Sequence, residues 1–163
     1  MPIEKSTIGE IRADPALYEW MDSHAIKGYM FQHLLRGKVN GRASDDESLV
    51  YIYYSETDEI WGWSFVFDYP WETCPNIGVY VLPDYRRKGI GKLLRNAILE
   101  DNPGEFYCQP GNRAGFLTYH DEPRLRIRAS QLKTPEYEQA RRERSKLYRH
   151  AVSVRSHARR KRR

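Results

Sequence analysis

The stretch VLPDYRRKGIGKLL, residues 81–94, decides the fold. It connects an apolar run typical of a strand to a run typical of a helix, through a basic loop that contains Gly89 and Gly91. The first N–H groups of a helix have no partner within the helix, and the helix dipole is positive at that end. Glycine also lets a phosphate approach the main chain closely. The stretch therefore predicts an anion-binding loop between a strand and a helix.

Two common phosphate-binding loops do not fit this stretch. A Walker loop needs a glycine where Arg86 stands and a Ser or Thr where Leu93 stands. A dinucleotide-binding fingerprint needs Gly or Ala at the position of Leu94. Both nucleotide-binding classes are therefore excluded for this loop.

The loop resembles the signature of the GNAT family of N-acyltransferases, which is Arg or Gln, two residues, Gly, one residue, then Gly or Ala. The resemblance implies an α/β (α+β) fold, with a mixed, mostly antiparallel sheet flanked by helices, and acetyl-CoA as the cofactor. In that family the loop amides hold the CoA pyrophosphate, and the preceding strand pairs with the pantetheine arm. The residues that match these positions are Val79, Tyr80 and Val81 for pantetheine, and Arg86, Arg87, Lys88, Gly89, Ile90 and Gly91 for pyrophosphate.

A second resemblance lies about twenty residues further on. Family members use an asparagine to bond the pantetheine region and a tyrosine seven residues later to protonate the departing CoA thiolate. Asn112 and Tyr119 have that spacing, so the resemblance implies a binding role for Asn112 and a catalytic role for Tyr119. A packed aromatic is the alternative for Tyr119. Gly115 costs a helix about 1 kcal/mol relative to alanine, so this helix is expected to be short or distorted.

Acyl transfer to an amine also needs a carboxylate or an ordered water that removes the proton from the amine. Where several relatives have a glutamate in the strand before the loop, this chain has Pro75. Glu72 is the nearest acid and is the candidate general base, with Asp68 and Glu59 as alternatives. Cys108 is interpreted as a buried structural thiol, and no metal site is predicted from two cysteines.

Runs of β-branched and aromatic residues predict strands over residues 49–54, 60–67, 77–82, 106–108 and 125–128. Helices are expected in two segments within residues 16–36, and over 93–99 and 112–120. In the helix 93–99, the apolar residues with helical spacing are Leu93, Leu94, Ala97 and Ile98. No strand is evident before Arg12.

The charge is divided unevenly along the 163 residues. Residues 1–123 carry 12 basic and 19 acidic side chains, net −7, whereas residues 124–163 carry 15 basic and 3 acidic ones, net +12. This division predicts a GNAT-like acyl-CoA-binding domain over 1–123 and a basic C-terminal arm over 124–163, with a helix that opens near Thr134. Nucleic acid is the expected partner of the arm, and the alternative is an arm folded on the acidic domain. A membrane is not an expected partner.

The N-terminus lacks the pattern of a secretory signal, and two cysteines are typical of a reducing compartment, so a cytoplasmic protein is expected. The first interpretation is an acetyl-CoA-dependent N-acetyltransferase that acts on a primary amine of a protein or small molecule. After Tyr119, however, the chain lacks the Gly-Phe turn with which relatives continue into two further strands of the acceptor pocket. The competing interpretation is a non-catalytic protein of GNAT fold, associated with nucleic acid or with a nucleoprotein assembly such as a viral particle.

Overall fold

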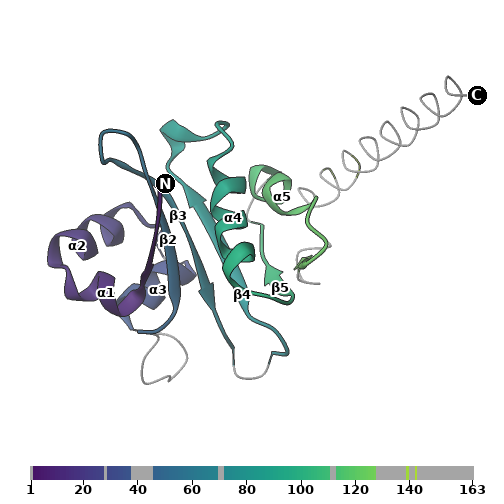
Figure 1. Cartoon of the computed structure of the whole chain (residues 1–163), viewed down its shortest axis with the longest axis horizontal. Coiled ribbons are helices and arrows are strands. Elements are labelled where there is room, and N and C mark those ends of the chain that lie inside the picture. Colours follow the sequence, from purple (N-terminus) through teal and green to yellow (C-terminus); the bar gives the residue numbers. More distant parts are fainter. Residues whose placement is uncertain are drawn as a thin grey trace, which may run out of the picture.

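A computed structural model describes residues 2–27, 29–37, 46–69, 72–110 and 113–127, together with Gln139 and Arg142. In these residues a six-stranded sheet carries helices on both faces (Figure 1). The strands are β1 (Ile3–Thr7), β2 (Leu49–Tyr54), β3 (Ile60–Phe67), β4 (Asn76–Val81), β5 (Phe106–Cys108) and β6 (Leu125–Ile127). The helices are α1 (Ile8–Ala13), α2 (Pro15–His24), α3 (Met30–Arg36), the short 3-10 turn η1 (Pro83–Tyr85), α4 (Ile90–Asp101) and α5 (Arg113–Tyr119).

The strands lie in the sheet in the order in which they occur in the chain. Neighbouring strands from β1 to β4 are antiparallel, and β4, β5 and β6 run parallel to one another. The sheet is therefore mixed, as the resemblance to the GNAT family implies.

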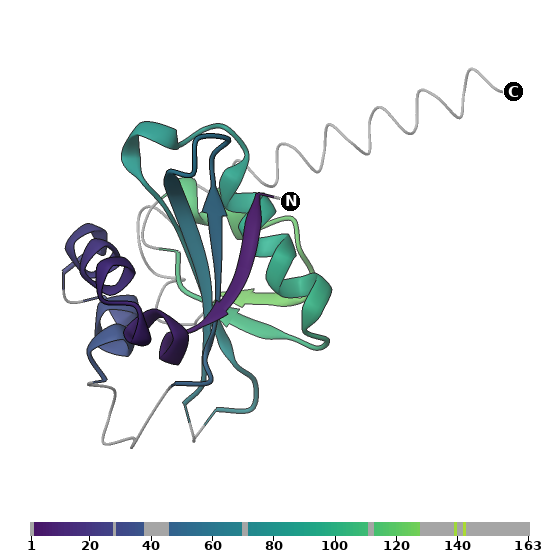
Figure 2. The same ribbon diagram turned by 60° about the vertical axis from the view of Figure 1, so that its left-hand side comes forward.

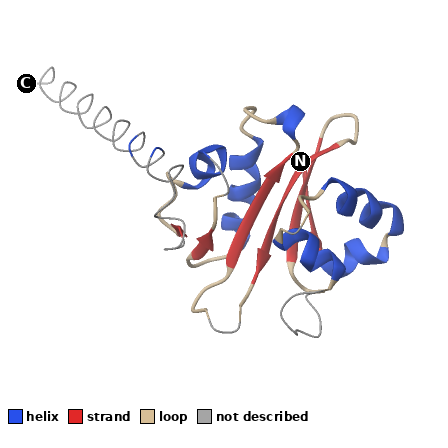
Figure 3. Cartoon of the chain, turned by 180° about the vertical axis from the view of Figure 1, so that it is seen from behind, coloured by secondary structure: helices blue, strands red, loops and turns tan. Residues whose placement is uncertain are grey.

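The helices form two layers, with α1–α3 on one side of the strands and α4 and α5 on the other (Figures 2 and 3). Side chains alternate between the two sides along each strand. In β2, Val50 and Ile52 pack under α1–α3, whereas Tyr51 between them packs under α4. In β4, Tyr80 lies on the α1–α3 side and Val79 on the α4 side.

β1 and α1 correct the expectation that no strand precedes Arg12. β1 pairs with β2 at the edge of the sheet, and none of its residues is fully buried: Ile3, Ser6 and Thr7 are partly buried, and Glu4 and Lys5 are exposed. An edge strand that buries so little lacks the apolar alternation on which strand prediction depends. The Thr7 side chain then begins α1 by accepting a hydrogen bond from the Glu10 N–H at 3.2 Å.

α4 confirms Leu94 and Ile98 on the expected apolar face of the helix 93–99 and corrects the place of Leu93. Leu93 is 49% exposed, and the buried residues of α4 are Ile90, Leu94, Arg95, Ile98 and Leu99. The helix begins three residues earlier than expected, directly at the end of the basic loop. α5 has seven residues and is short, as Gly115 predicts.

β6 falls within the segment assigned to the basic arm, and it pairs with β5 through three residues. The sheet therefore extends to Ile127. The two-part division of the chain stays a prediction, because nearly all of residues 128–163 lie outside the described residues. Of the helices described, none is long and apolar enough to cross a membrane.

Candidate functional site

The central feature of the candidate site is a gap in the sheet between β4 and β5. Within the described residues, these strands pair only at Asn76 with Tyr107 and at Ile77 with Cys108. β5 ends there, while β4 continues to Val81. The Tyr107 N–H donates to the Pro75 carbonyl at 2.8 Å, so odd-numbered residues turn their main-chain groups toward β5. The main-chain groups of Val79 and Val81 therefore face the gap.

The basic loop follows β4 and leads into the N-terminus of α4. Gly89 is the N-cap residue, with φ of 79°, and Arg87 has φ of 66°. No side chain caps the helix, and the Leu93 N–H makes the first helical bond, to the Gly89 carbonyl. The N–H groups of the preceding first turn have no carbonyl acceptor within the helix. Left-handed residues such as Arg87 and Gly89 can direct successive amides to one side of a turn, an arrangement that binds anions in other proteins.

The two glycines of the loop have different surroundings. A Cβ atom built on Gly89 meets nothing within 4 Å, so the side of the loop at Gly89 is open to a ligand. A Cβ atom on Gly91 would lie 3.2 Å from the Thr118 Oγ1 atom. Gly91 is therefore required for the close approach of α4 and α5, and Gly89 for the left-handed turn.

Two cationic side chains of the loop contact residues of β3 and β4. The Arg86 Nε atom donates to the Val81 carbonyl at 2.9 Å, and its guanidinium lies 5.8 Å from the centre of the Tyr80 ring. The Lys88 ammonium lies 4.9 Å from the centre of the Trp61 ring. Both side chains are exposed at the outer side of the loop and keep positive charge beside the first turn of α4.

Tyr119, the last residue of α5, is 5% exposed and lies at the gap. Burial raises the pKa of its phenol well above the ordinary value, and the neighbouring Cys108 raises it further, while a hydrogen bond with the main chain of Val79 lowers it. The phenol is therefore protonated at neutral pH and is in contact with the strand residue that faces the gap. Tyr119 belongs to the buried cluster under α4, so a packed aromatic and a catalytic acid both fit its position, and its catalytic role stays a prediction.

Cys108 lies beside Tyr119 and is 1% exposed. Burial raises the pKa of its thiol to about 12, so the thiol is not a nucleophile at neutral pH. Its Sγ atom lies 3.7 Å from the Arg126 carbonyl, which it approaches as a weak donor. Cys74 is also a free thiol. Cys108 is thus a packed thiol next to the candidate acid.

The candidate base Glu72 lies in the loop before β4, at the end of that strand opposite the basic loop. Its Oε2 atom accepts a hydrogen bond from the Asn76 amide at 2.8 Å. Of the two alternatives, Asp68 is exposed, and Glu59 lies 3.5 Å from the Trp61 indole nitrogen. Asn112 lies outside the described residues. Glu72 as base and Asn112 as a binding residue both stay predictions.

A family model for the acetyltransferase (GNAT) family matches residues 7–105. The chain belongs to the GNAT family. The match contains β2, β3, β4, the basic loop and α4, and it ends before β5. Tyr119 and Asn112 lie beyond the matched residues, so their assignment depends on spacing and, for Tyr119, on its place at the gap. No curated protein and no solved structure matches the chain.

Sequence reasoning missed Arg95 and Asp121, which join α4 to the end of α5. The Arg95 Nη1 atom donates to the Thr118 carbonyl at 2.7 Å and to the Asp121 carboxylate at 2.5 Å. Arg95 precedes Ile98 by three residues and Leu99 by four, so helical spacing places a charged residue on the buried face of α4. That spacing was the available signal, because a buried charge needs a partner.

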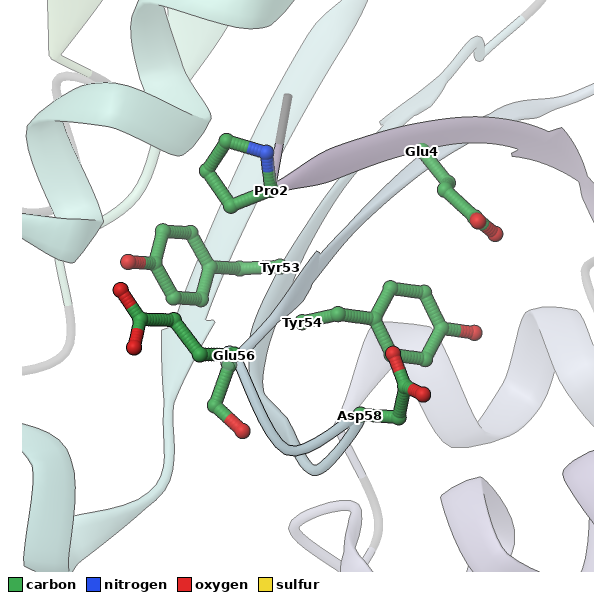
Figure 4. Close-up of a pocket in the computed structure, with 7 residues that line it drawn as sticks. Pro2, Glu4, Tyr53, Tyr54, Glu56 and Asp58 are labelled. Atoms are coloured by element: carbon green, nitrogen blue, oxygen red, sulfur yellow. The ribbon is translucent and has the colours of Figure 1, made fainter.

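A surface pocket lies elsewhere, where the N-terminus meets the β2–β3 hairpin. Figure 4 shows the side chains that line it, among them Tyr53, Tyr54 and three carboxylates. None of the predicted site residues lines this pocket. Across the described part of the chain, no cluster of three His, Cys, Asp or Glu side chains could hold a metal ion.

Proposed function

We propose that this protein is an acetyl-CoA-dependent N-acetyltransferase that transfers an acetyl group to a primary amine of a protein or small molecule, in the cytoplasm. The observation that supports it best is the meeting of the buried Tyr119 phenol with the main chain of Val79, in the gap beside the uncapped start of α4. In the competing interpretation, a protein of GNAT fold without catalysis, Tyr119 would serve as a packed aromatic.

The basic loop has the properties needed to hold the pyrophosphate of CoA. Its amides from Arg87 to Gly91 lie next to the positive end of α4, and the side at Gly89 is open, whereas the Arg86 N–H donates to the Pro83 carbonyl at 3.5 Å. The main chain of Val79 and Val81 faces the gap, where the pantetheine arm would pair as a strand does. Arg86 occupies the Val81 carbonyl, so pantetheine pairing at that position requires the Arg86 side chain to move.

When bound, acetyl-CoA supplies the acyl group as a thioester. The hydrogen bond from the Val79 main chain lowers the pKa of Tyr119, so the Val79 N–H donates to the phenol oxygen, and it would have to turn to the thioester carbonyl, where negative charge develops during acyl transfer. Tyr119 keeps its proton at neutral pH and would give it to the departing sulfur atom. Glu72, or a water molecule, would accept the proton from the amine.

Isothermal titration with acetyl-CoA tests the binding step, and release of CoA in the presence of amines and lysine peptides tests the transfer step. We expect micromolar affinity and a higher melting temperature, since binding at 100 times Kd stabilises a protein by about 2.7 kcal/mol. Binding without CoA release for any amine would favour the non-catalytic alternative. Absence of binding at millimolar acetyl-CoA would contradict the proposal.

Gly104 provides a matched control for the loop. Gly89 and Gly104 both have positive φ, and a Cβ atom on either meets nothing within 4 Å. Gly89→Ala and Gly104→Ala therefore introduce similar backbone strain, of about 1–2 kcal/mol. We expect only Gly89→Ala to weaken acetyl-CoA binding, because only its methyl group enters the anion site. Equal affinities for acetyl-CoA in the two variants would show that the loop is not the anion site.

We propose as a second function that the basic arm binds nucleic acid without sequence preference, on the basis of its net charge of +12. Deleting residues 134–163 should then abolish binding to duplex DNA and leave acetyl-CoA binding intact. Affinity should fall steeply with salt, with a log–log slope of about −0.9 per phosphate neutralised. Gel shifts at two salt concentrations measure this, and equal binding by the truncated protein would favour an arm folded on its own domain.

A further inference from the structure

The position of Tyr119 depends on a short helix with little stability of its own. α5 has seven residues and contains Gly115, and helices of this length are not stable in isolation. Tyr119 is its last residue, so a change in the direction of the last turn moves the phenol relative to Val79. Contacts with the rest of the molecule must therefore fix this turn.

Arg95 of α4 makes the contacts that fix it. The last four carbonyl groups of a helix have no partner within the helix. The Arg95 Nη1 atom donates to one of these carbonyls, that of Thr118, at 2.7 Å. The Thr118 side chain lies close to α4, because its Oγ1 atom is 3.2 Å from the position that a Cβ atom on Gly91 would take. The residue before Tyr119 is thus held through both its main chain and its side chain.

Asp121 holds the chain on the other side of Tyr119. Its Oδ1 atom accepts from the Arg95 Nη1 atom at 2.5 Å, and its Oδ2 atom accepts from the Lys92 ammonium at 3.2 Å. The Arg95 side chain is 7% exposed, whereas those of Lys92 and Asp121 are 48% and 42% exposed. Loss of the contact with Asp121 is therefore expected to cost more for the buried Arg95 charge than for the exposed Lys92 charge.

A guanidinium is suited to this position because it is planar and rigid and can donate several hydrogen bonds at once. While Nη1 contacts Thr118 and Asp121, the Nε atom donates to the Asn96 side chain at 3.0 Å. These contacts fix the plane of the group, which a lysine ammonium cannot do. Arg95 lies six residues after Gly89, or about 9 Å along the helix, so α4 links the anion loop rigidly to the end of α5.

We propose that Arg95 and Asp121 are positioning residues, which hold the last turn of α5 so that the Tyr119 phenol meets the main chain of Val79. The consequence for turnover rests on the proposed acetyltransferase function. Neither residue lies at the reacting atoms, so both act through Tyr119. The alternative is that Arg95 and Asp121 only stabilise the fold.

A double-mutant cycle on turnover separates these two roles. Arg95→Lys should lower kcat about 10- to 100-fold, because a misplacement near 1 Å can cost about 100-fold. The KM for acetyl-CoA should change by less than about twofold, since the loop and β4 are intact. In the Tyr119→Phe background, Arg95→Lys should lower kcat by less than about threefold more. If the fold-losses of kcat in the two single variants multiply in the double variant, Arg95 does not act through Tyr119.

A spectroscopic measurement tests the positioning without turnover. Protein with ¹³C-labelled tyrosine rings gives a Tyr119 resonance, which the Tyr119→Phe variant assigns. Arg95→Lys should shift this resonance. The control is Arg36→Lys, which changes a more exposed arginine–aspartate pair on the other side of the sheet, where Arg36 contacts both carboxylate oxygens of Asp22 at 3.0 Å. The control should leave the Tyr119 resonance unchanged.

If Arg95→Lys does not fold, Asp121→Asn takes its place, because it leaves the contact between Arg95 and Thr118. An unshifted Tyr119 resonance in the folded variant would overturn the positioning role, whatever the activity. The two proposals can also be separated. If the wild-type protein releases no CoA but the Tyr119 resonance shifts in the variant, the proposed function is contradicted and the positioning role is supported.

Discussion

The two faces of the sheet bury different kinds of side chain. Under α1–α3 the buried side chains are mostly aliphatic and aromatic, with Phe31, Leu34 and Trp63 among them. Under α4 and α5 the buried set includes phenols and a thiol, represented by Tyr119 and Cys108. Buried polar groups are costly unless they are hydrogen-bonded, so the α4–α5 face has to be organised by specific contacts. We infer that the first face mainly supplies stability and that the second carries the chemistry.

The largest effect should come from Tyr119→Phe. Removing the hydroxyl group should lower kcat about 100- to 10,000-fold, the usual contribution of a general acid, with little change in acetyl-CoA affinity. Steady-state kinetics and titration calorimetry measure the two quantities. Tyr51→Phe is the matched control, because Tyr51 is also buried on this face and donates to Asp101 at 3.0 Å, away from the gap. Equal losses of kcat in the two variants would mean that the face contains no special acid.

On the other face, Leu34→Ala should affect stability alone. Leu34 is fully buried, and such a truncation lowers the free energy of unfolding by about 2–5 kcal/mol. Chemical denaturation measures this change. The kcat measured well below the melting temperature should equal that of the wild type. A large loss of kcat in the folded variant would show that the two faces are not separable.

The buried thiol should make stability depend on pH in the alkaline range. The pKa of Cys108 rises from 9.0 to about 12 on folding, so the unfolded chain loses its proton first as the pH increases. Stability from this group is complete below pH 9 and should fall by about 1.4 kcal/mol per pH unit above it. Denaturation between pH 8.5 and 10 should show this slope, and Cys108→Ala should remove most of it. If the slope is unchanged in Cys108→Ala but lost in Cys74→Ala, the pH dependence comes from Cys74 and not from Cys108.

A smaller effect is expected where a polar group on the α4–α5 face lies away from the gap. Ser64 is fully buried in β3 and donates to the Leu94 carbonyl of α4 at 3.0 Å. Ser64→Ala should lower the free energy of unfolding by about 1 kcal/mol and leave kcat nearly unchanged. If this variant loses activity as Tyr119→Phe does, the chemistry is spread over the face rather than concentrated at the gap.

The sequence predicted those features that depend on neighbouring residues. The strands over 49–54, 60–67 and 106–108 have the bounds that were expected. The junction between β4 and α4 could be read directly, because glycine spacing, charge and the change from strand to helix lie within fourteen residues, whereas anion binding at this loop stays a prediction. Each of these signals is local, and tertiary contacts do not override them.

Features that depend on distant residues could not be predicted in the same way. β1 has a polar sequence and becomes a strand because β2 provides its partner. Arg95 and Asp121 are 26 residues apart, and nothing in either segment specifies the other. The place of Tyr119 at the gap follows from the position of α5 against α4, which residue spacing alone does not determine.

The two-residue pairing of β4 with β5 also bears on how the molecule opens. Strands β1 to β4 are joined by five or six residue pairs at each junction, whereas only two pairs join β4 to the part formed by β5, β6 and α5. Amide hydrogen exchange should therefore divide the domain at this junction, with β5 and α5 exchanging earlier than β2 and β3. Tyr119 belongs to the less protected unit. A ligand that pairs with β4 and contacts Tyr119 would connect the two units, and slower exchange in α5 would report its binding.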